Sequence, residues 1–392
     1  MRVVFSVILI VAAVPVAVAR PAVTIPFESA NTTIFVRTEV NSHAFWFALD
    51  TGAGHSVIDL AAARAAQVEL GDSLAVTGAG QSAVMGRLVR RGSARLPGLD
   101  GVDQPLIVAL PLDRIASISG HEFAGILGSD FIARFVVEID YERHVLTLRD
   151  TGYDYHGHGD VLPITFNAAG HPQVTAQVID GHRSRRAGTF VVDTGSGAAL
   201  ILDTPFVERE GLLATGRVAV PWIEGQGLGG DIAGVVGRVD ALVIGRSRIR
   251  RPVTVFSRAA NGPLASQDAQ GNIGAAILEK FRVTLDYARM RIILEPNRRF
   301  SQPTEYNRSG LSLTASGPDF HDIWVAAVAE DSPAARADLR AGDRLVAIDG
   351  RPAESTSLSE IRLGFRDARR CALTIERGGE RLTRALVLRR RV

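Results

Sequence analysis

The sequence predicts a mainly β chain in which two copies of one β unit precede a small α+β unit. Short runs of Val, Ile and Phe are separated by Gly and Asp along most of the 392 residues, a pattern typical of strands joined by turns. Helical patterns are brief, as at residues 59–66. Three sequence blocks recur in the same order at an offset of about 145 residues, which indicates a duplication.

The first recurring block is an apolar run that ends in Asp-Thr-Gly, at Asp50-Thr51-Gly52 and again at Asp193-Thr194-Gly195. The other two blocks lie at residues 94–108 and 125–128 in the first copy and at 241–255 and 271–274 in the second. The last of them reads Gly-Ile-Leu-Gly in one copy and Gly-Asn-Ile-Gly in the other. The blocks place the copies at residues 23–150 and 161–296, which leaves residues 308–390 for the third unit.

Charge and cysteine content exclude several classes of function. The 44 basic and 42 acidic residues give a net charge of +2 and are spread along the chain, which argues against a nucleic-acid partner. Lys280 is the only lysine, so lysine-centred chemistry is not expected. The single Cys371 stands in an alternating apolar run, so we expect a buried thiol rather than a nucleophile.

The first residues have the pattern of an export signal. Met1-Arg2 carries a positive charge, residues 3–14 are almost all apolar, and Ala17-Val18-Ala19 supplies the small residues of a cleavage site. We therefore predict a signal peptide at residues 1–19 and a periplasmic or secreted product. The alternative is an uncleaved segment that anchors the chain to a membrane. No later segment is apolar enough to be expected to span one.

The duplicated Asp-Thr-Gly motif favours paired-carboxylate chemistry. Each aspartate follows an apolar strand, and the glycine permits a close backbone approach. If the two copies meet about a pseudo-twofold axis, Asp50 and Asp193 face one another and share one proton. The ionised carboxylate can then take a proton from water while the protonated one donates to a carbonyl oxygen. Such a pair hydrolyses an amide with no cofactor and no metal.

These motifs resemble the aspartic proteases, and the compact lobes resemble the retropepsin-like members, here with both lobes in one chain. The resemblance extends over residues 23–296. It implies that Asp50 and Asp193 are the catalytic pair and that Thr51 and Thr194 brace the two loops. It also implies that Gly52 and Gly195 permit the turns, and that the substrate is a polypeptide.

Glycine-rich runs at residues 77–82 and 225–230 occupy comparable places in the two copies, where the family has flaps that cover the substrate. The predicted flap residues are Gly78, Gly80, Gln81, Gly227 and Gly229. The motifs differ at the fourth residue, where Ser196 stands in place of Ala53. A serine hydroxyl bonded to the neighbouring carboxylate would favour its charged form, so we expect Asp193 to ionise more readily than Asp50.

The third unit resembles a PDZ domain of the circularly permuted bacterial kind. The resemblance rests on Ser332-Pro333-Ala334, Ala341-Gly342-Asp343 and Ile348-Asp349-Gly350. It implies a loop at Gly310 that captures a carboxylate and a peptide ligand that adds a strand beside the helix at residues 358–365. The alternative is a packing module that braces the two β units.

The sequence thus predicts an exported aspartic endopeptidase with a PDZ-like module that recruits substrate or regulates access. A catalytically silent peptide-binding scaffold of the same fold is the main alternative. A third hypothesis is a metal-dependent hydrolase that uses His156 and His158, which lie in the linker between the copies.

Overall fold

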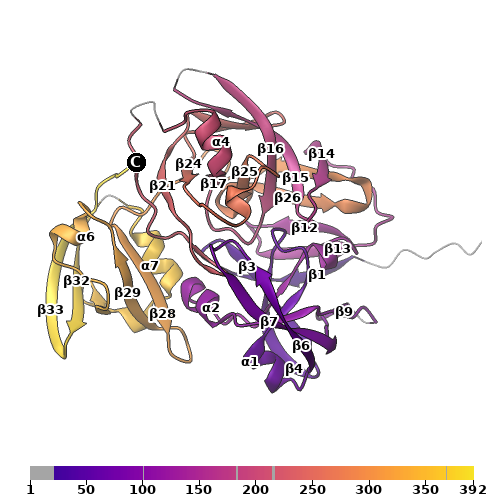
Figure 1. Cartoon of the computed structure of the whole chain (residues 1–392), viewed down its shortest axis with the longest axis horizontal. Helices are drawn as coiled ribbons and strands as arrows, with labels where there is room; N and C mark the ends of the chain where they lie inside the picture. The colour runs from indigo at the N-terminus through magenta and orange to yellow at the C-terminus, as the bar shows by residue number, and fades with distance from the viewer. Residues whose placement is uncertain (1–21, 100, 182–183, 214–216, 368) are drawn as a thin grey trace, which may run out of the picture.

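The computed structural model describes residues 22–392 except 100, 182–183, 214–216 and 368 (Figure 1). The predicted signal peptide at residues 1–19 lies outside the described residues. Two β lobes and a smaller C-terminal unit follow one another along the chain, so the predicted mainly β fold class is confirmed. Among the described residues, no helix has the length and apolar character needed to cross a membrane.

The first lobe is built on an eight-stranded sheet in the order β2-β3-β4-β11-β5-β10-β7-β6. The strands of the whole lobe are β1 (Val23–Pro26), β2 (Glu28–Ala30), β3 (Thr33–Val40), β4 (His43–Leu49), β5 (Val57–Asp59), β6 (Glu69–Thr77), β7 (Ala83–Arg91), β8 (Ser93–Ala94), β9 (Gln104–Pro105), β10 (Val108–Leu110), β11 (Gly125–Leu127), β12 (Val136–Asp140) and β13 (Val145–Arg149). Its helices are α1 (Leu60–Ala65), α2 (Asp113–Ser119) and α3 (Ser129–Ile132). Asp59 caps α1 by accepting hydrogen bonds from the backbone of Ala61 and Ala62, which explains the helix start predicted there.

The second lobe repeats this arrangement. Its strands are β14 (Asp160–Phe166), β15 (Pro172–Ile179), β16 (Arg185–Asp193), β17 (Leu200–Leu202), β18 (Val220–Pro221), β19 (Gln226–Gly227), β20 (Gly230–Asp231), β21 (Gly234–Arg238), β22 (Ala241–Ile244), β23 (Ser247–Arg250), β24 (Val253–Ser257), β25 (Gly271–Gly274), β26 (Phe281–Asp286) and β27 (Arg291–Pro296). Its helical turns are α4 (Thr204–Arg209), η1 (Pro263–Ala265), α5 (Ala275–Leu278) and η2 (Tyr287–Arg289). Figure 1 shows β12 and β13 of the first lobe beside β26 of the second.

The two lobes share a sheet that places their repeated elements in register. Strand β12 pairs antiparallel with β26, with Val136 opposite Asp286 and Asp140 opposite Arg282. Within the lobes, β4 runs parallel to β11 and β16 runs parallel to β25. The third repeated block therefore lies directly beside each Asp-Thr-Gly loop. This register decides which residue of the block meets each aspartate.

The C-terminal unit has a sheet in the order β28-β29-β30-β32-β33 with its own apolar core. Its elements are β28 (Leu311–Ser316), β29 (Asp322–Val328), α6 (Pro333–Arg336), β30 (Arg344–Ile348), β31 (Arg351–Pro352), η3 (Ala353–Ser355), α7 (Leu358–Gly364), β32 (Arg370–Arg377) and β33 (Glu380–Val387). Ser332 caps α6, and Ser357 and Glu360 form a capping box on α7. Cys371 is buried in β32, as predicted.

Candidate active site

The two Asp-Thr-Gly loops meet at the junction of the lobes and are braced by their threonines. The backbone N–H of Thr51 donates to Thr194 Oγ1, and the N–H of Thr194 donates to Thr51 Oγ1, both over 3.0 Å. Each hydroxyl also donates to a carbonyl of the opposite lobe, Thr51 to Val192 and Thr194 to Leu49 (2.9 Å). Both threonines are fully buried. The brace is thus reciprocal and fixes the relative position of the two loops.

Replacement of Thr51 tests this brace. In Thr51→Val, which keeps the shape, the buried N–H of Thr194 and the carbonyl of Val192 both lose their partner. We expect the free energy of unfolding to fall by about 2–4 kcal/mol. Urea unfolding of the full chain measures the loss. Thr51→Ser retains the hydroxyl and is the control, so an equal loss in both variants would assign the effect to packing.

The glycines of the two motifs make room for the opposite aspartate. A Cβ atom on Gly52 would lie 2.7 Å from Asp193 Oδ1, and a Cβ atom on Gly195 would lie 2.3 Å from Asp50 Cγ. Any side chain at either position would therefore displace a carboxylate. The absence of a side chain at Gly52 and Gly195 therefore leaves room for the carboxylate of the opposite loop. Asp50 and Asp193 can thus lie close together.

Asp50 is held in an environment that favours its protonated form. Burial, followed by repulsion from the Asp193 carboxylate, raises the pKa of Asp50 to about 7. The backbone N–H of Gly52 donates to Asp50 Oδ1 (2.7 Å) and opposes this rise. Ile126 of β11 occupies the position that Asn272 has in the second copy, and its side chain has no hydrogen-bonding group.

Asp193 has a richer set of hydrogen-bond donors. The N–H groups of Gly195 (3.1 Å) and Ser196 (2.9 Å) donate to its Oδ1, and Asn272 Nδ2 donates to its Oδ2 over 2.8 Å. Burial raises the pKa of Asp193, whereas Asn272, the Ser196 N–H and the nearby His171 lower it. Asn272 occupies the place of Ile126 in the repeated block. The dyad is therefore asymmetric, and Asp193 is the better supported anion.

The contact from Ser196 differs in kind from the one expected from the sequence. Its backbone N–H donates to Asp193, a bond that any residue at this position can make. The asymmetry that we assigned to the Ser196 hydroxyl comes instead from Asn272. A comparison of the two copies contained the signal, because Asn272 is a polar residue in a strand that is apolar in the first copy.

The predicted flap residues form two hairpin tips that bind each other. In the first tip, between β6 and β7, the N–H of Gly80 donates to the carbonyl of Leu228 (2.8 Å), and Ser82 donates to Gly229 (2.9 Å). Gly78 packs so closely on Leu228 that a Cβ atom would come within 2.6 Å of it. Gly227 lies in β19, Gly229 has a φ of 92° in the turn to β20, and Gln81 is exposed. The structure thus joins the two tips, a contact that the sequence did not predict.

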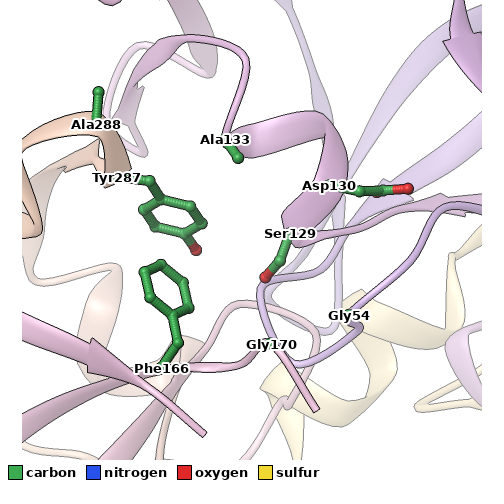
Figure 2. Close-up of a pocket in the computed structure, with 8 residues that line it drawn as sticks. All are labelled: Gly54, Ser129, Asp130, Ala133, Phe166, Gly170, Tyr287 and Ala288. Carbon is green, nitrogen blue, oxygen red and sulfur yellow. The ribbon is translucent and has the colours of Figure 1, made fainter. Parts of the chain in front are cut away.

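A recess of about 360 Å³ adjoins the Asp50 loop (Figure 2). The rings of Phe166 and Tyr287 lie edge to face on one side, with centroids 4.8 Å apart, and the Tyr287 hydroxyl points toward Ser129. Ser129 Oγ donates to the carbonyl of Thr51 (3.2 Å). The wall of the recess is therefore continuous with the braced loop.

The histidines in the linker do not gather with other metal-binding side chains. Within the described part of the chain, no group of three or more His, Cys, Asp or Glu residues is placed to hold a metal ion. The linker instead packs through Tyr155, whose hydroxyl donates to Glu295 Oε1 over 2.7 Å.

Two family models match parts of this chain. Residues 36–131 match the family model described as aspartyl protease, and residues 324–377 match the model described as PDZ domain. The chain combines an aspartyl protease-type domain with a PDZ-type domain. Among solved structures, an aspartic proteinase from Irpex lacteus is 14% identical, with a TM-score of 0.45 over 72% of this chain and 99% of that chain. No curated protein matches the sequence.

The PDZ domain contacts both protease-type lobes. Ser117 Oγ of α2 donates to the carbonyl of Ala315 in β28 (2.7 Å), and Asn307 Nδ2 donates to Glu224 of the second lobe (3.0 Å). The loop at Gly310 differs from a free carboxylate-binding loop. Asn307 Oδ1 already accepts hydrogen bonds from the N–H groups of Ser309 (2.9 Å) and Gly310 (3.3 Å).

Proposed function

We propose that this chain is an exported aspartic endopeptidase of the retropepsin-like kind, with Asp50 and Asp193 as its catalytic pair. The observation that carries the proposal is the asymmetric dyad, in which two buried carboxyl groups have different hydrogen-bond partners. A buried pair with separated proton affinities is suited to general acid–base catalysis. The substrate is a peptide bond in an extended polypeptide.

The proton positions follow from the contacts of each carboxyl group. Asp50 holds the shared proton, because its pKa is raised to about 7. Asp193 stays ionised, supported by Asn272 and two backbone N–H groups. Asp193 takes a proton from a water molecule between the two groups as the water oxygen attacks the carbonyl carbon. Asp50 donates its proton to the carbonyl oxygen, which gives a neutral tetrahedral diol. Asp193 then returns its proton to the amide nitrogen while Asp50 takes a proton from a diol hydroxyl, and the C–N bond breaks to give a carboxylic acid and an amine.

Substrate access requires the joined flap tips to move. The tips are linked by two backbone hydrogen bonds, at Gly80 and Ser82, and by the packing of Leu228. A substrate chain that passes beneath them must separate these contacts or slide along them. Gly78, Gly80, Gln81, Gly227 and Gly229 are accordingly proposed as substrate-covering residues.

Digestion of an unfolded protein tests the activity. The purified chain without residues 1–19 is incubated with reduced, alkylated casein from mildly acid to neutral pH. We expect fragments to form in the presence of a metal chelator and of serine and thiol blockers, and not to form with Asp193→Asn. Loss of cleavage with chelator would favour the metal-dependent alternative.

If the wild type cleaves nothing at any pH while it still binds unfolded casein, the silent peptide-binding scaffold replaces the proposal. Export is tested separately, by mass spectrometry of the chain recovered from the periplasm or medium of a bacterial host. A mass that begins at Arg20 supports cleavage after Ala19. A full-length mass in the membrane fraction supports the anchored alternative.

A further inference from the structure

Strand β28 is the edge of the PDZ sheet. Leu311, Leu313 and Ala315 are 1%, 2% and 0% exposed, and their side chains belong to the apolar core of the PDZ domain. Their carbonyl groups, which belong to alternate residues of the strand, each accept a hydrogen bond from a side chain. The donors are Asn307 Nδ2 to Leu311 (2.6 Å), Arg362 Nη2 to Leu313 (2.7 Å) and Ser117 Oγ to Ala315 (2.7 Å). An edge that an added strand needs for pairing is therefore already occupied.

Helix α2 of the first lobe lies against β28 and supplies one of these three donors (Figure 1). Besides the bond from Ser117, its last turn binds α7, because Arg362 Nη1 donates to the carbonyl of Ile118 (2.7 Å). Gly120, at the end of α2, lies so close to Leu358 that a Cβ atom would come within 2.6 Å of it. Arg362 thus binds carbonyl groups of both domains with one guanidinium group.

At the end of this edge, the second lobe inserts a carboxylate. Glu224 Oε1 accepts a hydrogen bond from Asn307 Nδ2 (3.0 Å), the side chain that also organises the loop before β28. Burial lowers the pKa of the half-buried Arg362 and Arg391, and the Glu224 charge opposes this shift in both. Arg391 Nη1 lies 3.3 Å from the Cβ position of Gly310 and has no hydrogen-bond partner among the described residues. This site accordingly attracts a carboxylate.

The same segments are connected to the flaps. Glu224 immediately precedes Gly225, at the start of the second flap run. Arg114 on α2 forms an ion pair with Asp231 in β20, and Leu228 packs against the same apolar cluster as Ile115 of α2. The second flap is therefore held on both sides by parts that also occupy the PDZ edge.

We propose that the protease-type domain occupies its own PDZ site, with Glu224 in the place of a ligand's terminal carboxylate and α2 along the β28 edge. An extended peptide with a free C-terminus competes with Glu224 and α2, and its binding releases the second flap. The competition is a two-state equilibrium, in which the apparent affinity for the peptide is reduced by the fraction of molecules with an open edge. Any effect of this release on cleavage rests on the proposed function, whereas the competition for the PDZ site does not.

The test compares Glu224→Gln with the wild-type full chain. The probe is a fluorescein-labelled pool of random heptapeptides with a free C-terminus, and the same pool with a C-terminal amide. We expect Glu224→Gln to bind the free-carboxylate pool about tenfold more tightly than the wild type and the amide pool no better. Glu354→Gln, at an exposed position elsewhere in the PDZ domain, is the matched control and should not change binding.

Hydrogen exchange provides a second readout. In Glu224→Gln, the amides of residues 224–231 should exchange several-fold faster, while those of β32 stay unchanged. Equal pool affinity in Glu224→Gln and the wild type would overturn the proposal, as would an equal gain in binding for the amide pool. Neither readout uses cleavage. A chain that passes both tests but cuts no substrate retains this inference and loses the proposed function.

Discussion

Replacing Asp50 with asparagine should abolish cleavage and at the same time stabilise the fold at neutral pH. Asparagine fills the same space but cannot donate the proton that the proposed mechanism assigns to Asp50, so kcat/KM should fall by about 10⁴-fold or more. It also removes a buried carboxyl group whose pKa is raised to about 7. Activity and stability should therefore change in opposite directions.

The sign of the stability effect follows from proton binding. The folded chain retains a proton on Asp50 that the unfolded chain loses near the ordinary pKa of about 4. The free energy of unfolding of the wild type therefore falls as the pH rises from about 4 to about 7. In Asp50→Asn this fall is reduced, which should leave the variant about 2–4 kcal/mol more stable at pH 7.

Urea unfolding at pH 4.5 and pH 7.5, together with casein digestion, measures both quantities. The two proteins should have similar stability at pH 4.5 and should differ most at pH 7.5. Glu354→Gln is the control for loss of one carboxylate at an exposed position. A variant that is inactive and also less stable at pH 7.5 would show that Asp50 is an anion held by its neighbours, contrary to the contacts described above.

The paired aspartates were predictable because the duplication places equivalent residues at equivalent positions. Asp50 and Asp193 each lie at the end of a strand in the same short motif. The repeat in the sequence predicts that the two copies pack about a pseudo-twofold axis, which brings the two motifs together. The threonine brace and the glycine requirement were likewise implied by the family resemblance. The structure adds the contacts that explain both, at Thr51 with Thr194 and at Gly52 with Asp193.

Contacts between distant segments were not predictable from local pattern. Glu224 and Asn307 meet only because the PDZ domain docks on the second lobe. Helix α2 was also missed, because it has seven residues and no side-chain cap at Leu112, so it carries few of the usual signals of a helix start. Its position, however, determines whether the β28 edge is accessible. The sequence therefore predicted the two Asp-Thr-Gly loops better than the contacts between the domains.

Asn272→Ile should move the acid limb of the pH–activity profile upward and lower kcat/KM. The substitution gives the second lobe the residue that the first lobe has at Ile126, so the strand should accept its shape. Asp193 Oδ2 loses a donor at 2.8 Å, and a hydrogen bond to a buried anion contributes about 1.5–3 kcal/mol. The ionised form of Asp193 then requires a higher pH, by about one to two pH units. The maximum of kcat/KM should fall by about 10- to 100-fold, because less of the dyad holds its proton on Asp50.

Ser196→Ala separates this effect from a general disturbance of the loop. The variant retains the backbone N–H that donates to Asp193 Oδ1, so its acid limb should coincide with that of the wild type. A shift of the acid limb in Asn272→Ile but not in Ser196→Ala would show that the Asn272 side-chain amide causes the asymmetry of the dyad. A shift in Ser196→Ala alone would show that the Ser196 hydroxyl causes it. Equal shifts in both would mean that the loop, rather than either donor, sets the proton affinity of Asp193, because both changes would then act through the same backbone displacement.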